Sequence, residues 1–107
     1  VDNWSPSKDL TGDDRYTVKS VPLLAARARR AFHEMTPISY SPGEPGRVYR
    51  KISYGPLLDV FFLDLRSYRG PNDEKLETSP NPILGHLQLR WLKRALATSD
   101  STWKVIA

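Results

Sequence analysis

A carboxylate, two guanidinium groups, a hydroxyl and a phenol follow one short apolar run of this sequence. The run ends at Leu63 and continues as Asp64-Leu65-Arg66-Ser67-Tyr68-Arg69. The planar fork of an arginine donates two parallel hydrogen bonds and suits the oxygens of a phosphate. Asp64 and Arg66 are therefore candidate residues for chemistry on a phosphate-like anion. The alternative is that Asp64 pairs with Arg66 or Arg69 and only stabilises the loop, since charged residues often form local networks.

The elements around these residues predict where they lie in the fold. Residues 57–63 form an apolar run typical of a strand that is covered on both faces. Residues 84–98 have an apolar stripe at helical spacing, and residues 102–107 again favour a strand. Together they predict a right-handed parallel βαβ crossover. Ligands of open α/β sheets bind beyond the carboxyl ends of the strands, where Asp64 stands.

The rest of the chain predicts a single α/β domain with two main helices. Residues 1–21 lack a sustained period and are expected to form a loop. Residues 22–35 have helical spacing, and Pro22 suits a first helical position. A strand pair over residues 47–63 is expected to form a hairpin around Gly55-Pro56. Residues 69–82 are polar and rich in turn residues, which predicts a long surface connection.

Composition limits the function only broadly. The 107 residues contain no cysteine, which excludes a disulfide framework and a thiolate metal site within this chain. The net charge of +4 suits an anionic partner such as a phosphate ester, a nucleic acid or an acidic lipid. There is no long apolar run for a transmembrane segment and no export signal in the chain.

Other polar residues on the predicted helices give weaker signals. His33 and His86 have no second ligand at metal-binding spacing on the same face, and both are expected on the surface. Arg27, Arg29 and Arg30 could form a stripe for nucleic acid. They have little aromatic interleaving, which favours a solvated helix face and argues against a nucleic-acid partner.

Four separated stretches resemble the PhoD-like alkaline phosphatases, a family of calcineurin-like metallophosphoesterases that includes relatives of a phospholipase D type. Val1-Asp2-Asn3-Trp4 is similar to the end of the family motif Asp-Asp-His-Glu-Val-x-Asn-Asn-Trp. The other stretches are residues 26–38, residues 47–50 with 63–69, and residues 84–92 with 102–106. Their order and spacing agree with the family over nearly the whole chain.

The resemblance implies a sandwich of two mixed sheets flanked by helices, of which this chain would be the middle part. It implies iron and calcium ions beneath the phosphate, with most metal ligands outside this chain. Asn3, and with less support Asp2, would stand near the metals, although Asp2 occupies a place where the family usually has Asn. Arg66 would bind phosphate, and Asp64 would orient Arg66 or a water. A secreted, periplasmic or cell-envelope location is implied for the parent protein.

The implied activity of the parent is metal-dependent hydrolysis of phosphoric esters, and we expect this chain alone to be inactive and to bind no metal stably. The alternative is a noncatalytic, basic binding or assembly module derived from the same family. Because the chain ends within the strand predicted over residues 102–107, we expect an incomplete domain. Such a chain is expected to self-associate or to stay bound to a complementary fragment of the same enzyme.

Overall fold

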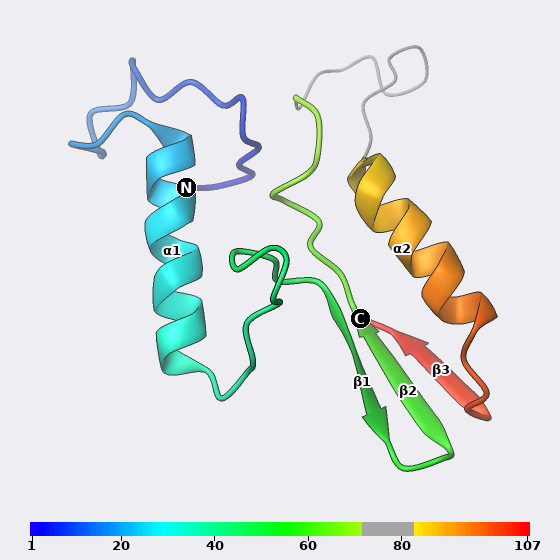
Figure 1. Cartoon of the computed structure of the whole chain (residues 1–107). Helices are drawn as coiled ribbons and strands as arrows, with labels where there is room; N and C mark the ends of the chain where they lie inside the picture. Colours follow the sequence, from blue (N-terminus) through cyan, green and yellow to red (C-terminus); the bar gives the residue numbers. More distant parts are fainter. Residues whose placement is uncertain (72–82) are drawn as a thin grey trace.

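The computed structural model describes residues 1–71 and 83–107. The predicted connection over residues 69–82 therefore lies mostly outside the described residues. The elements are helix α1 (Val21–Met35), strands β1 (Arg50–Tyr54) and β2 (Leu58–Phe62), helix α2 (Gly85–Ala97) and strand β3 (Trp103–Ile106). The three strands form one mixed sheet in the order β1-β2-β3 (Figure 1). The predicted α/β class, with two main helices, is confirmed.

Both predicted strand pairings are present. β1 pairs antiparallel with β2 around Gly55, whose φ of 62° suits a residue without a Cβ atom. β2 pairs parallel with β3 after the crossover through α2. The main-chain N–H of Leu63 donates to the carbonyl oxygen of Ala107 at 2.8 Å, so the pairing continues to the point where the candidate site begins.

Helix α1 lies apart from the sheet, with residues 36–49 between them (Figure 1). Ser20 caps the first turn, because its side chain accepts a hydrogen bond from the N–H of Leu23. Arg50 stabilises the segment of residues 36–49 by donating hydrogen bonds to the carbonyl oxygens of Val48, Ser39 and Arg47. The radius of gyration is 16.1 Å, compared with about 13 Å for a compact domain of 100 residues. The chain thus does not gather around one central core.

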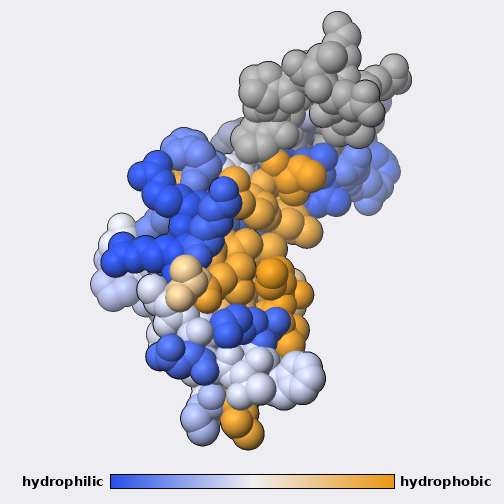
Figure 2. Space-filling model, turned by 90° about the vertical axis from the view of Figure 1, so that its right-hand side faces the viewer, coloured by the Kyte–Doolittle hydropathy of each residue, from blue (hydrophilic) through white to orange (hydrophobic). Residues whose placement is uncertain are grey.

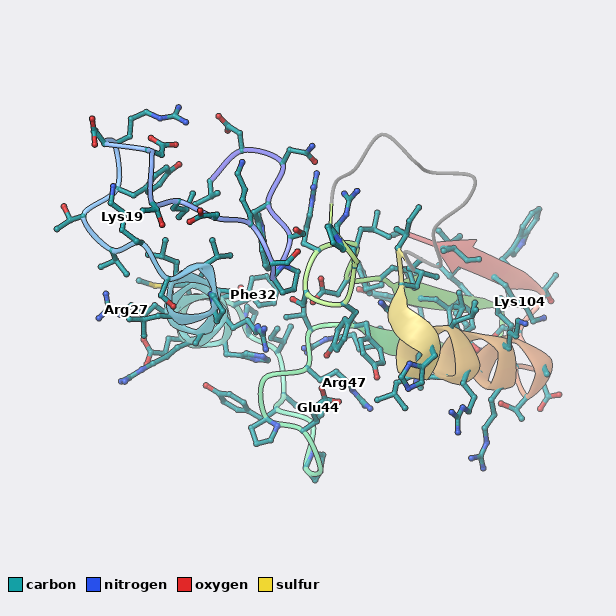
Figure 3. The ribbon with its side chains drawn as sticks, turned by 90° about the horizontal axis from the view of Figure 1, so that it is seen from above. Lys19, Arg27, Phe32, Glu44, Arg47 and Lys104 are labelled. Atoms are coloured by element: carbon teal, nitrogen blue, oxygen red, sulfur yellow. The ribbon has the colours of Figure 1, made fainter. Side chains whose placement is uncertain are left out.

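The sheet is covered on one face only. Asp59 and Phe61 are 2% and 0% exposed on the face that carries α2, which Figure 3 shows along one side of the sheet. The opposite face, here called the open sheet face, is lined by apolar residues that alternate with these. Its apolar members are Ile52, Tyr54, Leu58, Val60, Phe62, Trp103 and Val105, and Arg50 shares this face at the start of β1.

The prediction that residues 57–63 are buried on both faces is therefore wrong for this chain. Phe62 is 40% exposed and Trp103 is 68% exposed, because no helix or second sheet of the described residues packs against the open sheet face. Figure 2 shows hydrophobic side chains gathered over the side of the molecule that α2 and β3 form. An apolar run alone indicates burial on both faces, whereas actual burial requires a covering element.

A buried polar network joins the sheet to the end of α2. Asp59 accepts hydrogen bonds from the hydroxyls of Ser53 and Ser99, the second at 2.6 Å, and from Lys51 at 3.1 Å. The pKa of Asp59 is well below its usual range because these groups stabilise the carboxylate. The Ser53 hydroxyl has the largest effect, followed by the Ser99 hydroxyl and then Lys51. The ionised carboxylate therefore links β1, β2 and the connection between α2 and β3.

Because of this network, we expect the free energy of unfolding to fall in acid. Because the folded-state pKa of Asp59 is lowered, its contribution is complete above the unfolded value of about 4 and is lost as the pH falls below it. Asp59→Asn should lower the urea midpoint at pH 7, and this deficit should shrink at pH 3. The exposed Asp14 provides the control Asp14→Asn. A deficit of Asp59→Asn that stays constant between pH 7 and pH 3 would contradict the network.

Candidate functional site

Arg66 connects the loop after β2 with the N-terminal segment. Its Nη1 donates to Oδ1 of Asn3 at 2.7 Å and to the carbonyl oxygen of Trp4 at 3.4 Å, across 63 and 62 residues of sequence. Asn3 has a φ of 43°, the one positive φ outside glycine in the described part of the chain. Such a conformation costs about 1 kcal/mol and persists where surrounding contacts hold it. Two of the four stretches singled out in the sequence therefore meet here.

Asp64 organises the main chain of the same loop. Its Oδ1 accepts hydrogen bonds from the backbone N–H groups of Arg66 at 3.0 Å and of Ser67 at 2.8 Å. This is an Asx-type turn, in which a short carboxylate replaces a main-chain acceptor. Within the described residues, Asp64 forms no ion pair with Arg66 or Arg69. The loop is thus fixed through its backbone, which leaves the Arg66 guanidinium for other partners.

Gln88 on α2 holds the backbone of Asp64 from the other side. Its Oε1 accepts from the N–H of Asp64 at 2.8 Å, and its Nε2 donates to the carbonyl oxygens of Asp64 and Leu84, both at 2.9 Å. Gln88 is completely buried. Gln88 is not among the site residues predicted from the sequence. The signal was a single polar residue close to the apolar stripe of a helix, which by itself does not identify its partner.

A second contact between the helix and the loop is made at Gly85. A Cβ atom at this position would lie 2.9 Å from Cβ of Tyr68, and Gly85 has a φ of 69°. Tyr68 in turn packs edge-on against Tyr49 and donates from its hydroxyl to Glu44 at 2.9 Å. Burial and then the Glu44 hydrogen bond raise the pKa of Tyr68 well above its usual value, so the phenol stays protonated.

The loop also forms one wall of a cavity of about 650 Å³. The other walls come from α1, the N-terminal segment and Val48. Most lining residues are apolar, and the polar members include Arg29, Asp64, Arg66 and Ser67. The volume lies within the range of about 300–1,000 Å³ that is common for ligand sites. The structure therefore places both predicted site residues, Asp64 and Arg66, at a cavity that can take a small molecule.

The described residues do not by themselves supply a metal centre. Iron and calcium bind through clusters of carboxylate, imidazole and other oxygen ligands. Residues 1–71 and 83–107 contain no group of three or more His, Cys, Asp or Glu side chains that could share an ion. Asn3 offers one amide oxygen, which already accepts a hydrogen bond from Arg66. The described residues thus do not fit the ion cluster, and the role of Asn3 as a metal ligand stays a prediction.

One of the two histidines departs from its expected place. His86 is exposed as predicted, but His33 is only 6% exposed, so the prediction of a surface His33 is wrong. The chain turns back after α1 and stacks the ring of Tyr40 on that of His33, with 4.4 Å between ring centroids. Neither ring nitrogen has a hydrogen-bond partner among the described residues.

The basic residues of α1 also behave differently from one another. Arg27 and Arg30 are exposed, as expected of a solvated face, and Arg30 pairs with Glu34 at 2.7 Å. Arg29 is half-buried and lines the cavity, so the predicted solvated face does not extend to it. Three neighbouring arginines thus do not form one continuous basic stripe.

The comparisons with known proteins agree with the family motifs found in the sequence. A family model described as PhoD-like phosphatase matches residues 1–107, and the chain belongs to that family. The resemblance inferred from the sequence is confirmed. The chain is also 33% identical over 103 residues to alkaline phosphatase D of Bacillus subtilis (strain 168), a match that covers 85% of this chain. It spans 18% of the length of that relative. No solved structure matches the chain.

No helix in the described part of the chain has the length and apolar character needed to cross a membrane.

Proposed function

We propose that the whole protein hydrolyses phosphoric esters and that Arg66 binds the phosphoryl group. The observation that carries this proposal is the position of Arg66, which follows the carboxyl end of β2, lines the cavity and is held by Asn3. Among the described residues its side chain donates only from Nη1. A guanidinium has five N–H groups, so others can bind phosphate oxygens.

In this proposal Asp64 is a positioning residue. Its carboxylate fixes the N–H groups of Arg66 and Ser67, and Gln88 fixes the backbone of Asp64 in turn. A guanidinium held in place before the substrate arrives loses less entropy on binding it. The proposal includes metal dependence, with iron and calcium as the expected ions. Their ligands would come mainly from residues other than those described.

The test compares the full-length protein with residues 1–107 alone. We expect the full-length protein to hydrolyse chromogenic phosphate monoesters or diesters and to lose this activity with a chelator. We expect the isolated chain to show no turnover, because the described residues form no metal centre. Chelator-sensitive turnover by the isolated chain would contradict the second expectation, and an inactive full-length protein supplied with iron and calcium would contradict the first.

A noncatalytic, basic binding module is the second candidate function. The observation that favours it is the presence of half-buried cations without carboxylate partners. The side chains of Arg29 and Arg47 form no ion pair within the described residues, and Nε of each is buried without a hydrogen-bond partner. Anion binding by a full-length protein that hydrolyses no ester under any metal condition would favour this function.

We further propose that the isolated chain self-associates through the open sheet face. Seven apolar residues line this face, and both outer strands of the described sheet have an unpaired edge. Exposed apolar sheet surface of this kind favours association. Sedimentation of residues 1–107 at micromolar concentration should show a dimer or larger species. Trp103→Lys with Val105→Lys should shift it toward the monomer.

A stable, cooperatively unfolding monomer of 12.2 kDa would contradict self-association. Coexpression of residues 1–107 with the remainder of the full-length protein tests whether a complementary fragment binds this chain. A complex of the two fragments should then form in place of the dimer. The secreted or cell-envelope location also stays part of the proposal, and fractionation of cells that express the full-length protein tests it.

A further inference from the structure

Arg29 has an unusual position among the cations of this chain. It lines the same cavity as Arg66, and its Nε is buried without a hydrogen-bond partner among the described residues. Its side chain forms no ion pair among the described residues, although Arg30, the next residue, pairs with Glu34. A partly buried cation without a partner is unfavourable, because it has lost water without gaining an anion. The cavity therefore contains a cation that an anionic ligand would complement.

The guanidinium of Arg29 also lies close to the segment that follows α1. A Cβ atom at Gly46 would lie 3.3 Å from Nη1 of Arg29, so the segment after α1 approaches this group closely. The carboxylate that lines the same cavity belongs to Asp64, whose Oδ1 already accepts two backbone hydrogen bonds. Asp64 is thus engaged with the loop, and an external anion can bind to Arg29 without replacing an existing ion pair.

The remaining walls of the cavity are apolar. They come from α1, from the segment before β1 and from the segment after β2, and they include Val21, Leu24, Phe32, Val48, Leu63 and Leu65. Figure 3 shows Phe32 on the side of α1 toward the rest of the molecule and Arg27 on the other side. A small hydrophilic anion such as inorganic phosphate would leave these walls in contact with water. A ligand with a large apolar group would cover them.

We propose that this cavity binds phosphoric esters whose alcohol carries a large apolar group, and that Arg29 is a binding residue for their anionic group. The inference rests on the proposed function, because it takes the anion to be a phosphoryl group. It goes further in naming the class of ester and in assigning Arg29. Apolar burial would supply affinity, and the guanidinium would orient the anion.

Calorimetric titration of the full-length protein with alkylphosphonates tests this inference without hydrolysis, since their carbon–phosphorus bond is not an ester. Octylphosphonate should bind much more tightly than methylphosphonate, by up to about fourfold for each methylene that is buried. Arg29→Gln should weaken octylphosphonate binding by about tenfold or more, and Arg29→Lys by less. Arg27→Gln, which removes the same charge from the other side of α1, should have little effect.

Ala25→Phe should fill part of the cavity and weaken octylphosphonate binding more than methylphosphonate binding. Equal affinity for the two phosphonates, or equal effects of Arg29→Gln and Arg27→Gln in folded proteins, would overturn the inference. If esters are hydrolysed but octylphosphonate has no advantage, the inference fails and the proposed function stands. Arg29-dependent octylphosphonate binding by a protein that hydrolyses no ester would instead support the cavity and contradict the proposed function.

Discussion

Replacement of Arg66 by alanine in the full-length protein should lower kcat/KM by roughly 10- to 100-fold. The change removes charged hydrogen bonds to the phosphoryl group, each of which contributes about 1.5–3 kcal/mol. Arg66→Lys should recover only part of the loss, because a point charge replaces the planar fork. Steady-state kinetics with a chromogenic ester provides the measurement, and Arg69→Ala in the same loop is the matched control.

A double-mutant cycle with Asn3 separates binding of phosphate from support of the N-terminal segment. If Arg66 acts only by holding Asn3 at 2.7 Å, Asn3→Ala and Arg66→Ala should have the same effect, and the double variant should add nothing. If Arg66 binds the phosphoryl group, Arg66→Ala should lower kcat/KM further in the Asn3→Ala background. Unchanged kinetics together with a lowered Tm would assign Arg66 to stability alone.

Replacement of Gln88 by leucine should cause the largest loss of stability. Leucine removes three hydrogen bonds and leaves the N–H of Asp64 and two carbonyl oxygens without their partner in a fully buried position. Each unsatisfied buried group costs about 1–3 kcal/mol, so a total of about 2–5 kcal/mol is expected after partial relaxation. Urea unfolding measures the change. Leu87→Ala, at an exposed neighbour on α2, should cost much less.

Gln88→Glu tests whether the directions of the hydrogen bonds matter. The carboxylate can still accept from the N–H of Asp64, but it cannot donate to the carbonyl oxygens of Asp64 and Leu84. We therefore expect Gln88→Glu to be nearly as destabilising as Gln88→Leu at neutral pH and to recover partly in acid, where the side chain gains a proton. Full stability of Gln88→Glu at pH 7 would show that the two hydrogen bonds donated by Gln88 are not needed for stability.

The local elements could be predicted because local physics determines them. Pro22 and the helical spacing after it predicted the helix observed as Val21–Met35, and Gly55 with its flanking runs predicted the hairpin. The βαβ crossover followed from chain connectivity, since parallel strands need a long connection. The same reasoning placed Asp64 and Arg66 at the carboxyl end of β2, and the motifs identified the family that the comparison confirmed.

Tertiary structure alone decided which polar groups meet. The contact of Asn3 with Arg66 joins residues 63 positions apart, and no periodicity in the sequence encodes that approach. Gln88 and His33 each occupy a helix position that spacing leaves ambiguous, and both are buried because residues outside their own helix pack against them. Phe62 shows the converse, since an apolar side chain becomes buried only where another element packs on it. Periodicity determines which residues share a face. Their burial and their hydrogen-bond partners depend on which other segments of the chain pack against that face.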